Sequence, residues 1–254
     1  SKIFARISGF AFKTNDFCTV GIPIIKIKNI KTIKKLVKSK IRGIFLNKIL
    51  KYFGNINLED IKLPSPELVN YWRLAENRIF YIDYEIDESV LEIQRSIISI
   101  NITDKDIPVE ERVPIKIYLD TPGGLLSETM SLATTMIMSK TPVIIVNIAE
   151  AYSGGCLLLL AGHKRYTFPY AKAMLHTGYG GITGTYEQTE MAQKNYKKQI
   201  DEMSSYILAR SGMDEKVYKK NKAKDWYMDA NEQKQYGVVH EIVTSLDEIF
   251  AQSY

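Results

Sequence analysis

Residues 143–162 read VIIVNIAEAYSGGCLLLLAG, a short apolar run, a Ser-Gly-Gly turn and a second apolar run. The first run, Val143–Ile148, is rich in β-branched residues and predicts a strand in a sheet that is covered on both faces. The turn Ser153-Gly154-Gly155 then opens a helix that reaches about Gly162. A strand that leads into a helix through a tight turn is the repeating unit of parallel α/β sheets.

Strands and helices alternate on both sides of this stretch. Before it we expect two strands, each followed by a helix. The strand Ile79–Asp83 is followed by a helix that Asp87 caps and that reaches about Ser99. The strand Pro114–Leu119 is followed by a helix that ends at Thr141-Pro142. After it we expect a strand at Ala173–His176, an amphipathic helix at Thr185–Arg210 capped by Gly212, a short helix with the capping box Asp229/Glu232, and a closing strand at Val238–Val243. In the long helix we expect Tyr196, Ile200, Met203 and Ile207 to point inward, and Glu190 and Lys194 to pair outside. The sequence thus predicts an α/β fold with a mainly parallel sheet.

The composition is that of a globular domain rather than a membrane or disulfide-rich protein. Hydrophobic residues make up 45% and charged residues 25% of the 254 positions. No apolar run reaches the roughly 18–20 residues that cross a bilayer, and the start lacks the apolar segment of a secretory signal. The two cysteines, Cys18 and Cys156, favour a reducing, cytoplasmic environment. Three histidines without cysteine partners at ligand spacing lead us to expect no metal and no cofactor.

Charge is distributed unevenly along the chain. Residues 1–60 hold thirteen Lys or Arg against three Asp or Glu, a net charge of +10, whereas residues 61–254 balance at −5. We therefore predict a basic N-terminal extension, residues 1–63, and a separate body, residues 64–254, with the boundary at Pro64-Ser65-Pro66. The lysines of Ile30–Tyr52 fit either the solvated face of an amphipathic helix or a surface for nucleic acid or anionic membrane.

Three side chains could carry nucleophilic chemistry, in the order Ser153, His176 and Asp225. Ser153 follows a buried strand and begins a helix, where the helix N-terminus favours a developing oxyanion. His176 ends an apolar strand beside a glycine loop, and Asp225 precedes the aromatic pair Trp226-Tyr227. Each has an ordinary alternative: a helix N-cap, a core histidine and a solvated turn aspartate.

The loop Thr121-Pro122-Gly123-Gly124 lies between a predicted strand and helix. It fits a plain tight turn, and it also fits a loop that supplies a backbone N–H to an oxyanion hole.

Four separated motifs resemble the Clp protease proteolytic subunit family, in the family's order. They are NRIFYIDYEIDESV (77–90), YLDTPGGLLSETMSLATTM (118–136), AEAYSGGCLLLLAGHKRYTFPYAKAMLHTGYGG (149–181) and DWYMDANEQKQYGVVHEIV (225–243). The resemblance covers about residues 65–246. It implies a Clp/crotonase-like fold, a superhelix of repeated β-β-α units with a strand-helix handle.

By this resemblance Ser153 is the nucleophile, His176 the base and Asp225 the acid of a triad, with Gly123 and Gly154 as oxyanion-hole donors. It implies a serine endopeptidase that self-associates into rings, such as stacked heptamers, and cleaves unfolded polypeptide. Residues Tyr179–Thr185 and the helix after them look like the handle through which such rings pair.

The sequence departs from the family pattern at three places. The family usually has Gln-Pro where Thr177-Gly178 stand and Met where Gly154 stands, and residues 1–63 have no counterpart in it. Because residues 1–63 have no counterpart in the family, the sequence does not predict whether an AAA+ unfoldase docks.

Two further hypotheses come from other classes of protein. One is a catalytically silent Clp-like scaffold whose basic arm binds nucleic acid; residues 7–30, ISGFAFKTNDFCTVGIPIIKIKNI, resemble the opening of target-recognition domains in type I restriction specificity subunits. The other is an enzyme of the acyl-CoA hydratase type, which would use the oxyanion loops without the triad.

Overall fold

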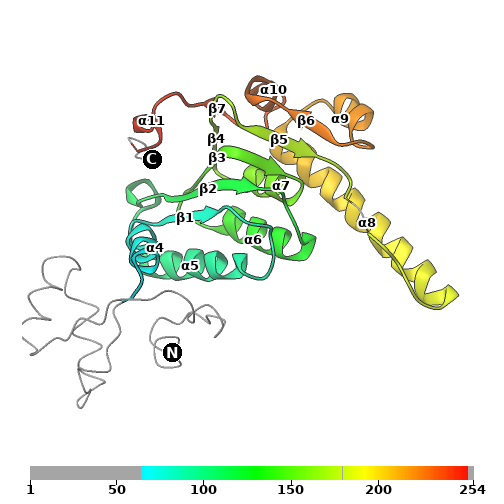
Figure 1. Cartoon of the computed structure of the whole chain (residues 1–254), viewed down its shortest axis with the longest axis horizontal. Helices are drawn as coiled ribbons and strands as arrows, with labels where there is room; N and C mark the ends of the chain where they lie inside the picture. Colours follow the sequence, from blue (N-terminus) through cyan, green and yellow to red (C-terminus); the bar gives the residue numbers. More distant parts are fainter. Residues whose placement is uncertain (1–63, 179, 251–254) are drawn as a thin grey trace, which may run out of the picture. The chain divides into compact units, whose positions relative to one another are not determined.

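The computed structural model describes residues 64–178 and 180–250 (Figure 1). Residue contacts divide the chain into two units after residue 73, a position within helix α4 (Pro66–Glu76). The predictions for the basic extension, its amphipathic helix and the motif at 7–30 all lie outside the described residues. The boundary at Pro64-Ser65-Pro66 therefore stays a prediction.

A mostly parallel sheet forms the centre of the second unit, which confirms the predicted α/β class. Five strands run side by side and parallel in the order β1-β2-β3-β4-β7. Their bounds are Ile79–Ile82, Ile115–Thr121, Val143–Tyr152, Lys164–Thr167 and Glu241–Ile242. Two strands continue the sheet elsewhere: β5 (Lys172–Leu175) pairs parallel with β3, and β6 (Trp226–Met228) pairs antiparallel with β5.

Strand β3 changes neighbours along its length. Its first part pairs with β4 from Ile144 to Asn147, whereas its last three residues pair with β5. The register against β2 shifts at the same place, because the β2 stretch Leu119–Thr121 faces the longer β3 stretch Asn147–Ala151. The strand predicted to end at Ile148 therefore reaches Tyr152, since β5 supplies partners that the local sequence does not reveal.

Helices cover the sheet on one face and build the main core there. They are α5 (Val90–Thr103), α6 (Leu126–Met138) and α7 (Gly154–Ala161), of which α5 and α6 lie beneath the sheet in Figure 1. Every residue of α7 is buried, as its apolar sequence predicts. A smaller cluster, which includes Tyr118, Val146 and Ile249, lies apart from this core, and Ile249 comes from α11 (Asp247–Phe250). The 3-10 turn η2 (Val109–Glu111) precedes β2.

The long helix α8 (Tyr186–Ser211) leaves the body at its N-terminal end (Figure 1). Its predicted C-cap is confirmed, because Gly212 has φ +70, a left-handed conformation suited to glycine. The predicted outer pair is present, with Lys194 Nζ 2.7 Å from Glu190 Oε1. Met203 and Ile207 are buried as predicted, but Tyr196 and Ile200 are only half-buried, because this part of the helix extends past the core.

The remaining C-terminal helices are short. They are α9 (Glu215–Asn221) and α10 (Ala230–Gln235), and α10 begins with the predicted capping box of Asp229 and Glu232. The closing strand is reduced to β7, which pairs with β4 through two residues only. Asp87 does not cap α5 directly; it accepts the N–H of Ser89, and the helix begins at Val90.

Among residues 64–178 and 180–250, no helix is both long and apolar enough to cross a membrane.

Candidate active site

The three predicted side chains meet where three strands end or begin. Ser153 follows the last residue of β3, His176 follows the last residue of β5, and Asp225 precedes the first residue of β6. Because β6 runs antiparallel to β5, its start lies beside the end of β5. His176 Nε2 is 2.7 Å from Ser153 Oγ, and His176 Nδ1 is 3.2 Å from Asp225 Oδ1. Three residues separated by 23 and 49 positions in the sequence thus form one continuous chain of contacts.

Ser153 has an unusual backbone conformation, with φ +51 and ψ −117. Non-glycine residues adopt a positive φ rarely, and doing so costs about 1–3 kcal/mol. Neighbouring bonds hold it there: its N–H donates to Met174 O at 2.9 Å, and its C=O accepts the N–H of Cys156 at 3.0 Å. Although Ser153 occupies the N-cap of α7, its hydroxyl makes no capping bond and faces His176 instead. Ser153 therefore does not act as an ordinary side-chain N-cap of α7.

Burial differs along this chain of contacts. The His176 side chain is 9% exposed, whereas that of Asp225 is 54% exposed. The imidazole is thus held in a largely enclosed position, between a partly buried serine and a carboxylate that faces solvent. An imidazole between a hydroxyl and a carboxylate can take a proton at Nε2 while the carboxylate stabilises the resulting charge.

The glycine loop before α6 lies directly against Ser153. A Cβ on Gly123, which has φ +97, would come within 2.7 Å of the Ser153 Cβ and 2.6 Å of Tyr152 O. The loop is fixed by the connection between β1 and α5: the N–H of Ile86 donates to Gly123 O at 2.7 Å, and Thr121 Oγ1 donates to Tyr84 O at 2.6 Å.

Backbone N–H groups around Ser153 are engaged to different degrees. The N–H of Gly123 donates to Thr121 Oγ1 at 3.2 Å. Within the described residues, the N–H groups of Gly154 and Gly124 have no hydrogen-bond partner. Gly124 was not singled out from the sequence; the only signal was its place as the second glycine of the pair.

A model of the Clp protease family matches residues 67–246. The chain belongs to the Clp protease family. Among curated relatives, the ATP-dependent Clp protease proteolytic subunit 1 of Rhodopirellula baltica is 28% identical over 173 residues, which cover 67% of this chain and 74% of that protein. The resemblance predicted from the four motifs is thereby confirmed, and with it the peptidase family.

The structure leaves little room for a side chain at Gly154, where the family resemblance led us to expect methionine. A Cβ on Gly154 would come within 2.6 Å of Thr129 Oγ1 on α6 and 3.3 Å of the Ile86 side chain. Thr129 is itself fixed, because its hydroxyl donates to Leu125 O at 2.8 Å. In this Clp-family chain, Thr129 and Ile86 thus fill the space that a larger side chain at position 154 would need.

Other nucleophiles and bases lie away from this contact. Burial raises the pKa of the Cys156 thiol to about 12, so it is protonated at neutral pH. His163 Nδ1 accepts the N–H of Val143, and His240 lies against Arg165. Neither of these two histidines contacts Ser153.

Proposed function

We propose that this Clp-family chain is a serine endopeptidase subunit with Ser153 as nucleophile, His176 as general base and Asp225 as the acid that orients it. The observation that carries the proposal is the unbroken contact from Ser153 Oγ to His176 Nε2 at 2.7 Å and from His176 Nδ1 to Asp225 Oδ1 at 3.2 Å. A serine hydroxyl is a weak nucleophile at its free pKa and needs an adjacent base, which this contact provides.

The reaction follows from the proton positions. Ser153 Oγ attacks the peptide carbonyl carbon while its proton passes to His176 Nε2, and the imidazolium is stabilised at Nδ1 by Asp225. When the C–N bond breaks, the Nε2 proton goes to the leaving amine, and the acyl group remains esterified to Ser153. Water then repeats the sequence, giving its proton to Nε2 and its oxygen to the carbonyl, and Ser153 is released.

Backbone donors would stabilise the tetrahedral oxyanion. Gly154 is well placed, because its N–H is unengaged within the described residues and lies at the N-terminus of α7. The second donor would come from the loop before α6. The N–H of Gly123 can bind the oxyanion only after its hydrogen bond to Thr121 Oγ1 breaks, whereas the N–H of Gly124 has no such bond to break. Both N–H groups are therefore candidates.

The family also suggests assembly into rings that enclose the active sites and admit unfolded polypeptide, with an AAA+ unfoldase as a candidate partner. The projecting half of α8 supports the pairing of rings, because it presents apolar side chains to solvent: Tyr186 is 77% and Met191 72% exposed.

The silent-scaffold alternative is less well supported. A scaffold needs neither the strained backbone of Ser153 nor the contact between its hydroxyl and His176. An acyl-CoA hydratase would likewise not need all three side chains in line, and the family match favours a peptidase.

Labelling with a fluorophosphonate probe tests the proposal. We expect the wild type to label, Ser153→Ala and His176→Ala to lose the label, and Ser127→Ala, which removes an exposed hydroxyl on α6, to label normally. Labelling that persists in Ser153→Ala would contradict the proposed nucleophile. An intact wild-type oligomer that does not label would contradict an activated serine altogether.

A further inference from the structure

Two amide side chains are fully buried where β3 changes neighbours. Asn147 lies on β3 and Gln233 on α10, 86 positions away in the sequence. Asn147 is the last β3 residue that pairs with β4, and the pairing with β5 begins at Glu150. The two amides therefore fill the interior of a branch in the sheet.

These amides connect three strands by hydrogen bonds. Gln233 Nε2 donates to Ala171 O, just before β5, at 3.0 Å and to Met228 O on β6 at 3.3 Å. Asn147 Nδ2 donates to Lys172 O on β5 at 2.9 Å and to Gln233 Oε1 at 3.1 Å.

The direction of these bonds is fixed by chemistry. A backbone carbonyl can only accept, so Gln233 must direct its NH₂ group at Ala171 O and Met228 O and its oxygen at Asn147. Asn147 must in turn direct its NH₂ group at Gln233 and Lys172. A carboxylate in either place would oppose oxygen to oxygen in a buried site, where unpaired polar groups are costly.

Each connected strand carries one residue of the proposed triad. Strand β3 ends before Ser153, β5 ends before His176, and β6 begins after Asp225. Strand β6 has only three residues and pairs with β5 alone within the described sheet, so its place depends on contacts beyond strand pairing. We infer that Asn147 and Gln233 are positioning residues that set the spacing of these strands, and thereby the alignment of His176 and Asp225 with Ser153. This inference rests on the proposed function.

The test variant is Gln233→Met, which keeps the length of the side chain and removes its hydrogen bonds. In the full-length, assembled protein we expect kcat, counted per correctly folded chain, to fall about 10–100-fold with KM within about twofold. Asn147→Ser should act in the same direction and add little to Gln233→Met, since both break one network.

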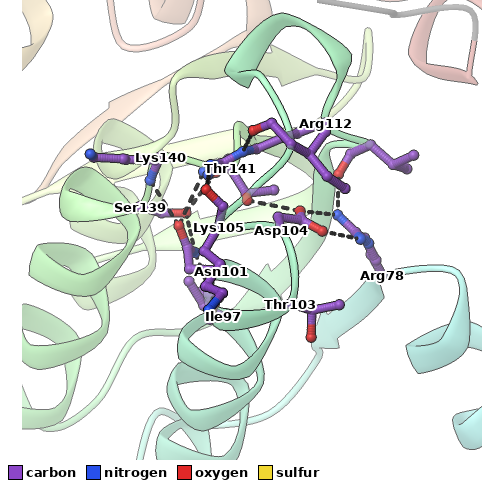
Figure 2. A network of polar contacts seen from close by, with 12 residues as sticks. Arg78, Ile97, Asn101, Thr103, Asp104, Lys105, Arg112, Ser139, Lys140 and Thr141 are labelled. Atoms are coloured by element: carbon purple, nitrogen blue, oxygen red, sulfur yellow. Dashed lines mark hydrogen bonds and ion pairs between the residues drawn. The ribbon is translucent and has the colours of Figure 1, made fainter.

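A matched control lies at the other end of the sheet. Thr141 is also fully buried, and its hydroxyl donates to Asp104 Oδ2 at 2.9 Å in the network of Figure 2, which joins the end of α5 to the starts of β2 and β3. Thr141→Val removes a buried hydrogen bond just before the start of β3, at the opposite end of that strand from Ser153. We expect it to lower the thermal midpoint while leaving kcat per folded chain and KM as in the wild type.

The outcomes separate the inference from the function on which it rests. Suppose that the wild type labels and cleaves, and that Gln233→Met, like Thr141→Val, changes only the thermal midpoint. This result overturns the positioning role and leaves the proposed function standing. The same conclusion follows if Gln233→Met and Asn147→Ser both fail to assemble, because the amides then serve folding. Wild type that neither labels nor cleaves overturns the proposed function and this inference together.

Discussion

At the scale of single residues, the proposed chemistry depends on a serine held in an unfavourable backbone conformation. Ser153 is one of two non-glycine residues with positive φ in the described part of the chain; the other is Arg78. The bonds to Met174 and Cys156 fix this conformation before any substrate arrives. Strain that the surrounding structure holds in place is a common feature of preorganised sites.

Asp225 orients His176 from a solvent-exposed position. Asp225→Asn keeps the shape but loses the charge that stabilises the imidazolium and favours the correct tautomer, so kcat for peptide hydrolysis should fall on the order of 10⁴-fold. KM and the thermal midpoint should change little, because the carboxylate is half exposed. A kcat within about threefold of wild type would exclude Asp225 from the triad.

Gly154 and Thr129 should behave as a coupled pair. The added Cβ of Gly154→Ala would come within 2.6 Å of Thr129 Oγ1 and displace the N–H of residue 154, so kcat should fall about 10²-fold. The double variant Gly154→Ala/Thr129→Ala removes the closest obstructing atom, Thr129 Oγ1, and should recover a large part of that loss. Steady-state kinetics of both single variants and the double variant measure the coupling; strictly additive losses would contradict it.

At the scale of elements, polar networks hold the ends of the sheet. Arg78 donates to both oxygens of Asp104, at 2.6 and 2.7 Å, and the guanidinium holds the pKa of that carboxyl below its ordinary value (Figure 2). The folded protein therefore gains stability from ionised Asp104 at neutral pH and loses it as the pH falls through the ordinary aspartate range, where the unfolded chain takes up the proton.

Asp104→Asn tests this contribution. We expect the free energy of unfolding at pH 7 to fall by about 1.5–3 kcal/mol, because a charge-assisted, buried pair is lost. The thermal midpoint of the variant should also fall less between pH 7 and pH 3 than that of the wild type. An unchanged slope in acid would contradict the role of Asp104.

His240 should make the fold sensitive to mild acid. Burial, with the positive charges of Arg165, Lys164 and Arg210, lowers the pKa of His240 to about 4 and outweighs the opposite effect of Glu241. Between pH 6.5 and 4, His240 is protonated in the unfolded chain but remains neutral in the folded chain. The free energy of unfolding therefore falls as the pH falls. In thermal unfolding curves, His240→Gln should reduce the loss of stability between pH 6.5 and 4. Part of that loss should remain in the variant, because burial also lowers the pKa of His163. An identical pH dependence would contradict the assignment to His240.

Local pattern predicted most elements but not their long-range connections. The order Ser153, His176, Asp225, together with the resemblance of the flanking motifs to the Clp protease family, predicted which side chains meet. The Asn147–Gln233 bond could not be predicted, because neither residue has a local pattern and the bond depends on where β3 leaves β4. The extension of β3 to Tyr152 was missed for the same reason, since its partner β5 is supplied by the fold.

At the scale of the whole molecule, the projecting part of α8 provides the surface through which rings are proposed to pair. Tyr186→Ser with Met191→Ser should weaken that pairing, because it removes the two most exposed apolar side chains of this helix. Sedimentation velocity should then show about half the assembled mass, while Lys197→Ser, an exposed polar change on the same helix, leaves the mass unaltered. Full-size particles from the double variant would place ring pairing elsewhere.

Cleavage of an unfolded protein tests the central claim most directly. Wild type and Ser153→Ala should be purified identically, shown to have the same assembled mass, and incubated with a casein at neutral pH. The account predicts short peptides, detected by mass spectrometry, from the wild type and none from Ser153→Ala. Equal peptide release from both proteins, or none from a fully assembled wild type, would contradict the assignment of Ser153, His176 and Asp225 as the catalytic centre of an endopeptidase.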